Sequence, residues 1–185
     1  MNEILKFPFA AFGNNWDDLQ LFLKHKGNPP YMITGDLDLR YSDIKTLGNL
    51  TSVGGDLDLR GTDIKSLGNL TSVGGDLDLR TTNIESLGNL TSVGGDLDLH
   101  DTKIESLGSL TSVGGDLDLR YSDIKTFGNL TSVGGVLDLS YTNVESLGYL
   151  TSVGWDLFLR GAPLSKKYSE KGIRSIVEVS HEIYF

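Results

Sequence analysis

Hydrophobic and polar positions recur along this chain with a fixed period. The segment GDLDLRYSDIKTLGNLTSVG begins at Gly35 and recurs at intervals of 20 residues without insertion. Its sixth copy ends at Gly154, and a partial copy, WDLFLRGAPL, opens at Trp155. A short unit of this kind cannot bury its own apolar face, so its repetition predicts a solenoid in which each copy packs against the next.

Two leucines alternate with aspartates at the start of each copy. In the first copy, Leu37 and Leu39 predict a strand of three to four residues with both leucines turned inward. The apolar residues that follow are Ile44, Leu47, Leu50 and Val53. Glycines interrupt them, so no long helix is expected. Seven such strands, stacked at ~4.8 Å, form a parallel sheet and a rod roughly 30 Å long.

The pattern L-x-L-x-x-[ST]-x-[IV]-x-x-[LF] resembles the leucine-rich repeat. Leu37, Leu39, Ser42, Ile44 and Leu47 occupy its positions in the first copy. The resemblance covers residues 35 to about 164 and implies an α/β solenoid, a leucine-rich-repeat-like parallel β-sheet rod of about seven coils. Ser or Thr replaces the usual Asn, and its hydroxyl can bond to the turn backbone. The unit is short for this family, so we expect little helix and a flat or weakly curved rod.

Residues 1–34 are predicted to form an N-terminal cap, because a bare solenoid end exposes its core. A helix is expected over about 15–26, with Asn15 as N-cap and Asp17 and Asp18 in its first turn. Gly27 and the prolines after it end this helix. Trp16 is expected to pack within the cap.

Residues 35–164 are then the solenoid and residues 165–185 a C-terminal cap. A helix is expected from about Ser169, with Ile173, Ile176 and Val177 on one face, and then a short strand, 182–185. Trp155 is expected to pack against this cap. The last residues resemble the ends of leucine-rich-repeat-like proteins encoded by tailed bacteriophages, which implies a viral origin.

Polar residues on the outer face of the predicted sheet form three columns. The first Asp column is Asp36, Asp56, Asp76, Asp96, Asp116 and Asp156. The second Asp column is Asp38, Asp58, Asp78, Asp98, Asp118 and Asp138. The Arg column is Arg40, Arg60, Arg80, Arg120 and Arg160, with His100 and Ser140 at the two other positions. Twelve carboxylates therefore stand against five guanidinium groups.

Three interpretations of these columns remain open at the sequence level. The Asp and Arg side chains can form a lattice that keeps a parallel sheet soluble. They can form an acidic docking face for a basic protein. Closely spaced carboxylates also suit calcium, although the spacing matches neither an EF-hand loop nor the nonapeptide calcium repeat.

Differences between copies point to a contact surface near the C-terminal end. The position after the Arg column, here called the corner column, holds Tyr41, Gly61, Thr81, Asp101, Tyr121, Tyr141 and Gly161. Exposed aromatic residues are common at interface hot spots. The predicted partner-binding residues are Tyr121, Val136, Tyr141, Phe158, Asp116, Asp118, Asp138, Asp156, Arg120 and Arg160. The alternative is that Val136 and Phe158 only adapt to the C-terminal cap.

Composition excludes several classes of function. The net charge of −9 disfavours nucleic acids and anionic membranes. The chain has no cysteine, no apolar stretch of transmembrane length and no recognisable signal peptide, so a cytoplasmic protein is expected. The three histidines belong to no catalytic motif, and equivalent solvated carboxylates do not separate an acid from a base. We therefore expect neither catalysis nor a cofactor.

The favoured function is a protein-binding module, in particular a phage-encoded factor that binds or inhibits a host protein through the acidic outer strand face. The first alternative is a structural or virion-associated scaffold protein. The second is binding to ice or another surface through the Thr and Ser residues that recur from Thr51 and Ser52 to Thr151 and Ser152. The sequence does not specify the oligomeric state.

Overall fold

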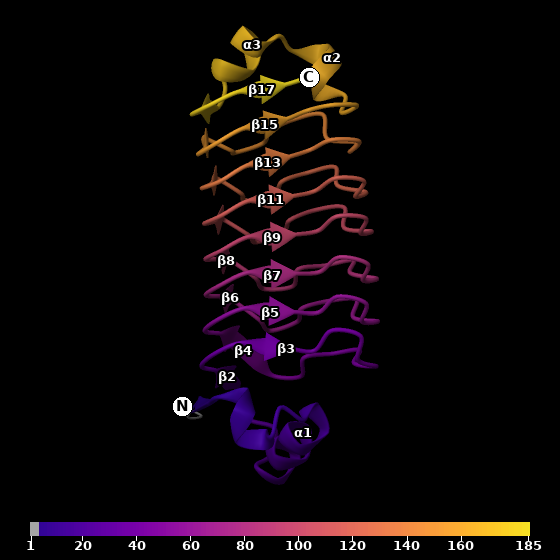
Figure 1. Cartoon of the computed structure of the whole chain (residues 1–185), viewed down its shortest axis with the longest axis vertical. Helices are drawn as coiled ribbons and strands as arrows, with labels where there is room; N and C mark the ends of the chain where they lie inside the picture. Colours follow the sequence, from indigo (N-terminus) through magenta and orange to yellow (C-terminus); the bar gives the residue numbers. More distant parts are fainter. Residues whose placement is uncertain (1–3) are drawn as a thin grey trace.

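The computed structural model describes residues 4–185 and is a parallel β-solenoid (Figure 1). Each copy of the repeat forms one turn, and strands pair with the equivalent residues 20 positions away, as Leu57 does with Leu37 and Leu77. The 20-residue period predicted from the sequence is therefore the period of the coil.

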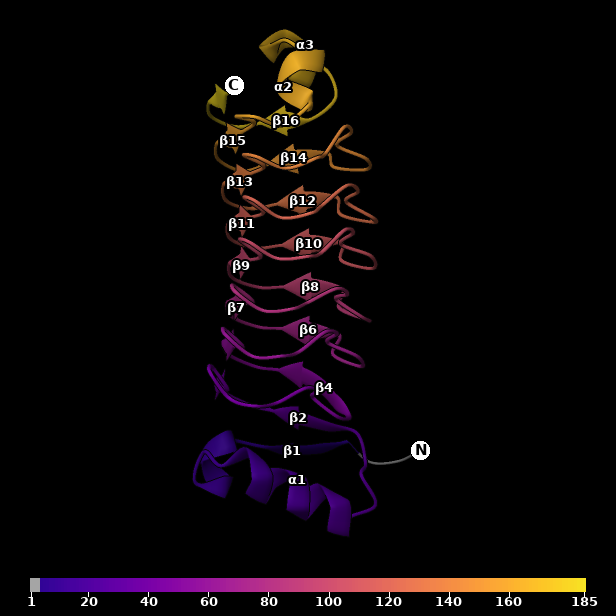
Figure 2. The same cartoon turned by 90° about the vertical axis from the view of Figure 1, so that its right-hand side faces the viewer.

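Every turn contributes to two sheets. The Asp-face sheet contains β3 (Leu37–Asp38), β5 (Leu57–Asp58), β7 (Leu77–Asp78), β9 (Leu97–Asp98), β11 (Leu117–Asp118), β13 (Leu137–Asp138), β15 (Leu157–Phe158) and β17 (Ile183–Tyr184). The Ser-face sheet contains β1 (Leu5–Phe7), β2 (Tyr31–Ile33), β4 (Leu50–Val53), β6 (Ser72–Val73), β8 (Ser92–Val93), β10 (Ser112–Val113), β12 (Ser132–Val133), β14 (Ser152–Val153) and β16 (Glu178–Val179). Figure 2 shows the Ser-face sheet from the side.

The second sheet corrects the expectation of one strand per coil. The predicted strand of three to four residues around Leu37 has two residues in regular pairing. The segment after Gly48 pairs as well: the Thr71 N–H donates to the Thr51 carbonyl at 2.8 Å, and the Gly74 N–H donates to the Val53 carbonyl at 2.9 Å. Once coils stack in register, the backbone groups of this segment face their equivalents and are satisfied by pairing.

Leucine, isoleucine and valine side chains fill the space between the sheets. Leu57 and Leu59 are both buried, which confirms that the two leucines of the repeat point inward. The repeat hydroxyl also has its predicted partner, because Thr62 Oγ1 donates to the Leu59 carbonyl at 2.8 Å. Each added coil thus buries the same apolar set without leaving this hydroxyl unpaired.

A helix lies at the N-terminal end of the rod (Figure 2), with a cluster of aromatic rings beside it. Helix α1 spans Trp16–His25, and Asn15 Oδ1 accepts the Asp17 N–H at 2.9 Å. A short 3-10 helix, η1 (Phe9–Phe12), precedes it. Partly buried aromatic rings and Trp16 pack against the core between these helices and β2. The helix predicted from the sequence is therefore present, one residue shorter at each end than its expected range.

Two short helices lie at the C-terminal end, α2 (Leu164–Lys167) and α3 (Glu170–Arg174). The helix expected from about Ser169 is present as α3, and Ser169 is its N-cap, because Ser169 Oγ accepts the Gly172 N–H at 3.3 Å. Ile173 and Val177 are buried, whereas Ile176 is half exposed. The prediction that all three share one apolar helix face is wrong, because α3 ends at Arg174 and both Ile176 and Val177 lie beyond it.

Candidate interaction surface

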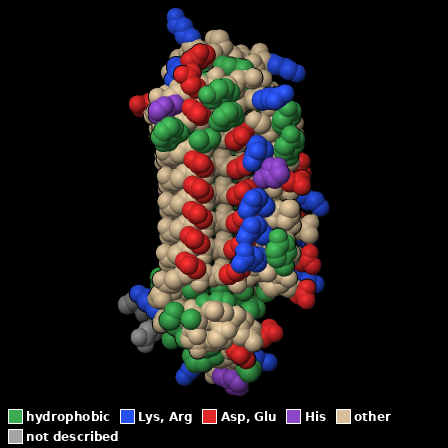
Figure 3. All heavy atoms as spheres, viewed as in Figure 1, with side chains coloured by type: hydrophobic (Ala, Val, Ile, Leu, Met, Phe, Trp, Pro, Cys, Tyr) green, Lys and Arg blue, Asp and Glu red, His purple; other side chains and the backbone are tan. Residues whose placement is uncertain are grey.

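The carboxylates of the first Asp column link successive coils. Asp36 Oδ1 accepts the backbone N–H of Asp56 at 3.0 Å, and Asp56 Oδ1 accepts that of Asp76 at 2.8 Å. The bonds continue through Asp96 to Asp116, which accepts the Val136 N–H. These side chains form a single file along the rod (Figure 3). One carboxylate oxygen of each therefore has a structural role.

Glycine is required above each of these aspartates. A Cβ atom on Gly55 would overlap Oδ1 of Asp36, and the same holds for Gly135 above Asp116. The glycine and the aspartate of the repeat are therefore coupled between coils. The aspartate of one coil occupies the space that is left because the next coil has glycine there.

The second Asp column and the Arg column form ion pairs within and between coils. Arg60 Nη2 lies 2.5 Å from Asp58 Oδ2, and Arg60 Nε lies 3.1 Å from Asp78 Oδ2. Burial alone would raise the pKa of Asp58, but the hydrogen bonds and charge of Arg60 outweigh it and lower that pKa. Arg120 bridges Asp118 and Asp138 in the same way, at 2.5 and 3.6 Å. These two columns therefore form an ion-pair lattice, which was one of the three interpretations left open by the sequence.

His100 leaves a gap in this lattice. It occupies the Arg position beside Asp98, whose nearest cation is Arg80 of the preceding coil, with Nε 3.1 Å from Asp98 Oδ2. Burial, followed by the charge of Asp118, raises the pKa of Asp98. The carboxylate is thus less well compensated here than elsewhere in the column.

Two predicted residues, Tyr121 and Tyr141, form an exposed aromatic stack in the corner column. Their ring centroids are 4.9 Å apart with an interplanar angle of 8°, and the rings are 56% and 44% exposed. His100 packs edge-on against Tyr121, and the Arg160 guanidinium lies 5.9 Å from the Tyr141 ring centroid. Four side chains from successive coils therefore make one continuous surface.

Val136 and Phe158 lie elsewhere on the same face, close to the C-terminal end. Both are half buried, and Phe158 stacks on Tyr184 of β17 with centroids 4.5 Å apart. Asp156 Oδ1 accepts the Glu182 N–H at 3.0 Å, a bond of the same kind at the residue before β17. The predicted patch thus divides into a Tyr corner and a C-terminal group, and the latter includes contacts with the end of the chain.

Trp155 contacts the predicted C-terminal cap at His181, but the cap does not bury it. Its side chain is 55% exposed and stacks on His181, which is exposed too, with centroids 4.2 Å apart. Sequence reasoning left Trp155 out of the predicted surface. The sequence does contain a sign of this surface: two positions that differ from the regular repeat lie one above the other. Trp155 replaces a glycine, and Val136 replaces the aspartate below it.

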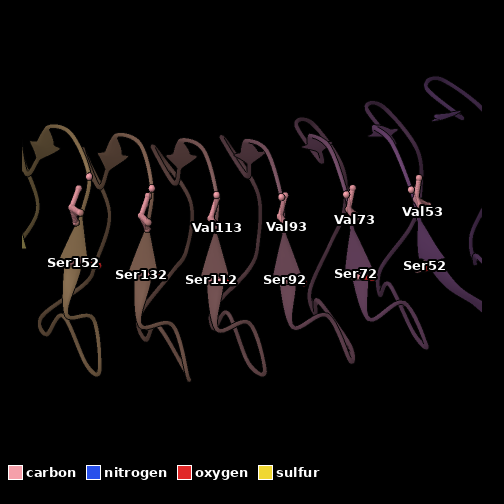
Figure 4. Close-up of a pocket in the computed structure, with 18 of the residues that line it drawn as sticks. Ser52, Val53, Ser72, Val73, Ser92, Val93, Ser112, Val113, Ser132 and Ser152 are labelled. Carbon is pink, nitrogen blue, oxygen red and sulfur yellow. The ribbon is translucent and has the colours of Figure 1, made fainter. Parts of the chain in front are cut away.

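A shallow groove runs along the Ser-face sheet beside the first Asp column. It has a volume of about 820 Å³ and is lined by the Ser, Val and Gly residues of successive coils (Figure 4). The neighbouring threonine hydroxyls donate to the preceding coil, as Thr71 Oγ1 does to the Thr51 carbonyl at 2.8 Å. This row of hydroxyls therefore contributes hydrogen bonds that hold the coils together.

Residues 4–185 contain neither a metal-binding cluster nor a membrane-spanning helix. In that range no group of three or more His, Asp or Glu side chains is arranged to hold a metal ion. None of the helices described has the length and apolar character needed to span a bilayer.

A family model described as Toastrack DUF4097 matches residues 31–147, which include the first five turns of the repeat. No curated protein and no solved structure matches the chain.

Proposed function

The chain belongs to the Toastrack DUF4097 family, and we propose that it is a non-enzymatic protein-binding module. The observation that carries this proposal is the exposed stack of Tyr121 and Tyr141, two tyrosines on adjacent coils of the corner column. The remaining tyrosine of that column, Tyr41, has Gly61 on the next coil. Tyrosine offers a large contact area and a hydroxyl at low cost in side-chain entropy, which suits a binding surface.

The backbone and the next coil both favour the stacked arrangement of the two rings. Tyr121 and Tyr141 have φ angles of 57° and 60°, so the backbone directs both rings away from the core at a tight corner. Gly161 leaves room for the Tyr141 ring on the next coil. A surface ordered in advance loses little entropy on binding, which favours affinity.

The charge of the Asp-face sheet supports a basic partner. Arginines offset most of the second Asp column, whereas the first Asp column has no neighbouring cationic column. An acidic strip beside exposed tyrosines favours a protein with a basic face and disfavours nucleic acid or an anionic bilayer. The repeated, near-equivalent carboxylates do not offer the distinct environments that acid–base catalysis uses.

Two resemblances suggest what kind of protein this binding module is. The 20-residue unit resembles the leucine-rich repeat, and the C-terminal residues resemble the ends of phage-encoded proteins. On this basis the protein is a viral factor that occupies a host protein in the host cytoplasm. The partner is then a host component, such as a defence protein, and inhibition follows from covering its surface.

A pull-down from host lysate with quantitative mass spectrometry tests this function. The variant Tyr121→Ala/Tyr141→Ala should lose a specific protein by about tenfold or more, as expected for hot-spot residues. The matched control is Tyr41→Ala/Tyr149→Ala, which removes two tyrosines that are 75% and 71% exposed elsewhere on the rod. Equal capture by the two double variants, or no captured protein, would contradict the proposal.

The second function is a structural or scaffold protein, which the Asp ladder favours. Hydrogen bonds from Asp36 to Val136 join the first six coils in the same way, so this part of the rod is held uniformly. This function requires self-association or incorporation into a particle. Sedimentation velocity over a wide concentration range would detect it, and a strict monomer would argue against it.

A further inference from the structure

We propose that the first Asp column, the groove beside it and Trp155 together bind an extended, lysine- or arginine-rich segment of a protein partner, with an apolar side chain against Trp155. This inference rests on the proposed protein-binding function and names the chemistry of the partner. It concerns a surface separate from the Tyr corner.

Two neighbouring positions near the C-terminal end of the first Asp column differ from the regular repeat. Val136 stands at an aspartate position, and Trp155 stands at the glycine position of the coil above it. From Gly55 to Gly135 that glycine has no room for a side chain, because Oδ1 of the aspartate below fills the space. The tryptophan is compatible with the fold because Val136 has replaced that aspartate, so the two substitutions depend on each other.

The C-terminal end of the rod does not bury the tryptophan. Trp155 keeps 55% of its side chain exposed, and its stacking partner His181 is exposed as well. Hydrophobic and histidine side chains gather where the file of aspartates ends (Figure 3). Since packing at the end of the rod does not account for this exposed ring, it is available to a partner.

The carboxylates that lead to Trp155 are unneutralised. Within residues 4–185, no member of the first Asp column forms an ion pair, whereas the second Asp column is bridged by arginines. Oδ1 of Asp76, Asp96 and Asp116 accepts a backbone N–H, which leaves Oδ2 for a partner. A row of partly free carboxylates ending at an apolar ring is complementary to cationic residues followed by an apolar one.

The groove provides space for the backbone of such a segment. Its walls carry small side chains from six turns, and the chain passes directly from Gly54 in the groove through Gly55 to Asp56 in the column. Ser52 lines the groove, is 8% exposed, and its hydroxyl has no hydrogen-bond partner among the described residues. A buried hydroxyl without a partner is uncommon and can bind a polar group of a ligand.

The length of the site sets the length of the probe. From Asp36 to Trp155 there are six coil steps, or ~29 Å at ~4.8 Å each. An extended peptide of about nine residues spans this distance at ~3.3 Å per residue. Alternating residues of an extended peptide point to opposite sides, so lysine at every second position would face the carboxylates while the other residues face the groove.

The test measures binding of labelled synthetic peptides to the purified chain by fluorescence anisotropy at low ionic strength. The first peptide is Leu-Leu-Ser-Lys-Ser-Lys-Ser-Lys-Ser-Lys, and in the second glutamate replaces every lysine. The lysine peptide should bind about tenfold or more tightly than the glutamate peptide, and added salt should weaken it.

Two variants separate charge from shape. Asp76→Asn/Asp96→Asn/Asp116→Asn keeps an oxygen that accepts each backbone N–H but removes three negative charges. Val136→Asp/Trp155→Gly restores the residues of the regular repeat. It removes the exposed ring and adds one carboxylate to the column, so weaker binding by this variant reports the loss of the ring. Each variant should weaken the lysine peptide about tenfold or more. As a control, Asp17→Asn/Asp18→Asn/Asp43→Asn removes three carboxylates away from the column and should change little.

A second readout uses the tryptophan itself. Trp16 and Trp155 are the two tryptophans of the chain, so the Trp16→Phe variant makes fluorescence specific for Trp155. Its emission should shift to shorter wavelength when the lysine peptide covers the ring. If Trp16→Phe fails to fold, loss of the wild-type shift in Val136→Asp/Trp155→Gly provides the same information.

Equal binding of the two peptides, or no binding by either, would overturn this inference. So would full affinity in both site variants. None of these results affects the capture of a partner through Tyr121 and Tyr141, so the proposed function and this inference can fail separately.

Discussion

Individual residues of the corner column adopt a backbone conformation that most side chains avoid. The φ angles are 55° at Tyr41, 66° at Gly61 and 56° at Thr81. This left-handed region suits glycine, and asparagine and aspartate tolerate it, whereas a β-branched side chain is strained there. The tyrosines of the proposed binding surface occupy the same strained position, which favours a functional reason for their presence.

The variant Thr81→Asn should stabilise the protein by about 1 kcal/mol, because asparagine adopts the left-handed conformation at lower cost. Urea denaturation followed by circular dichroism measures the change. The control is Asp101→Asn, which changes a residue of the same column that already tolerates this conformation and should have little effect. A stability equal to or below that of the wild type would show that Thr81 is not strained.

The variant His100→Arg should stabilise the protein at pH 7 by about 0.5–1 kcal/mol, because a guanidinium group would pair with Asp98. The folded-state pKa of Asp98 lies above its ordinary value of 3.8. The folded state therefore binds a proton at Asp98 more readily than the unfolded state does. The stability that this protonation contributes is lost as pH rises through the raised pKa.

With arginine in place the pKa of Asp98 should fall, so the advantage of the variant should be present at pH 7 and shrink as pH falls below about 4. Urea denaturation over this pH range measures it. His25→Arg, far from the columns, should show no such dependence. An advantage that does not change with pH would contradict the assignment to Asp98.

At the scale of elements, each coil recognises the next through backbone pairing and through the Asp–Gly pair. A strand of two residues such as β5 (Leu57–Asp58) forms few ladder hydrogen bonds. The carboxylate of Asp36, which accepts the Asp56 N–H, extends the contact beyond the strand. The same pairing excludes a larger side chain at Gly55 and holds the coils in register.

This coupling predicts a non-additive pair of substitutions. Val136→Asp alone should destabilise the protein by about 1–3 kcal/mol, because the new carboxylate would crowd Trp155. In the Trp155→Gly background the same change should be close to neutral or favourable, because it rebuilds the regular pair. A double-mutant cycle by urea denaturation measures the interaction energy. Additive effects would show that the two positions do not depend on each other.

At the scale of the molecule, the rod is a linear array in which coils contact mainly their neighbours. Its ends differ from its middle: Arg174 Nη1 donates to the Val179 carbonyl and Nη2 to the His181 carbonyl, both at 2.6 Å, close to the last strands. The interior coils are close to interchangeable, so stability should grow with their number.

Insertion of a second copy of residues 75–94 after Gly94 should give a folded protein of higher stability. The slope of unfolding free energy against urea should rise by about 10%, in proportion to the added surface exposed on unfolding. The control insertion carries Ala in place of its first glycine, where a Cβ would overlap the aspartate below. This control should be less stable than the regular insertion. If both insertions lower the stability equally, the linear-array description is contradicted.

The sequence by itself determined the solenoid, its period and its inward residues, because near-identical copies can bury their leucines only by stacking in register. It also determined the helix after Asn15, through local capping that needs no distant contact. The outward columns followed from the alternation of residues in a strand.

Only the tertiary structure decided what those columns do. The bond from the Asp56 N–H to Asp36, the pairing of residues 50–53 in a second sheet and the stack of Tyr121 on Tyr141 join residues 20 positions apart in sequence. These contacts form only once neighbouring coils are stacked in register. The exposure of Trp155 likewise depends on how closely the C-terminal segment packs against it. A local sequence pattern does not encode this packing, because it joins segments that are distant in the sequence.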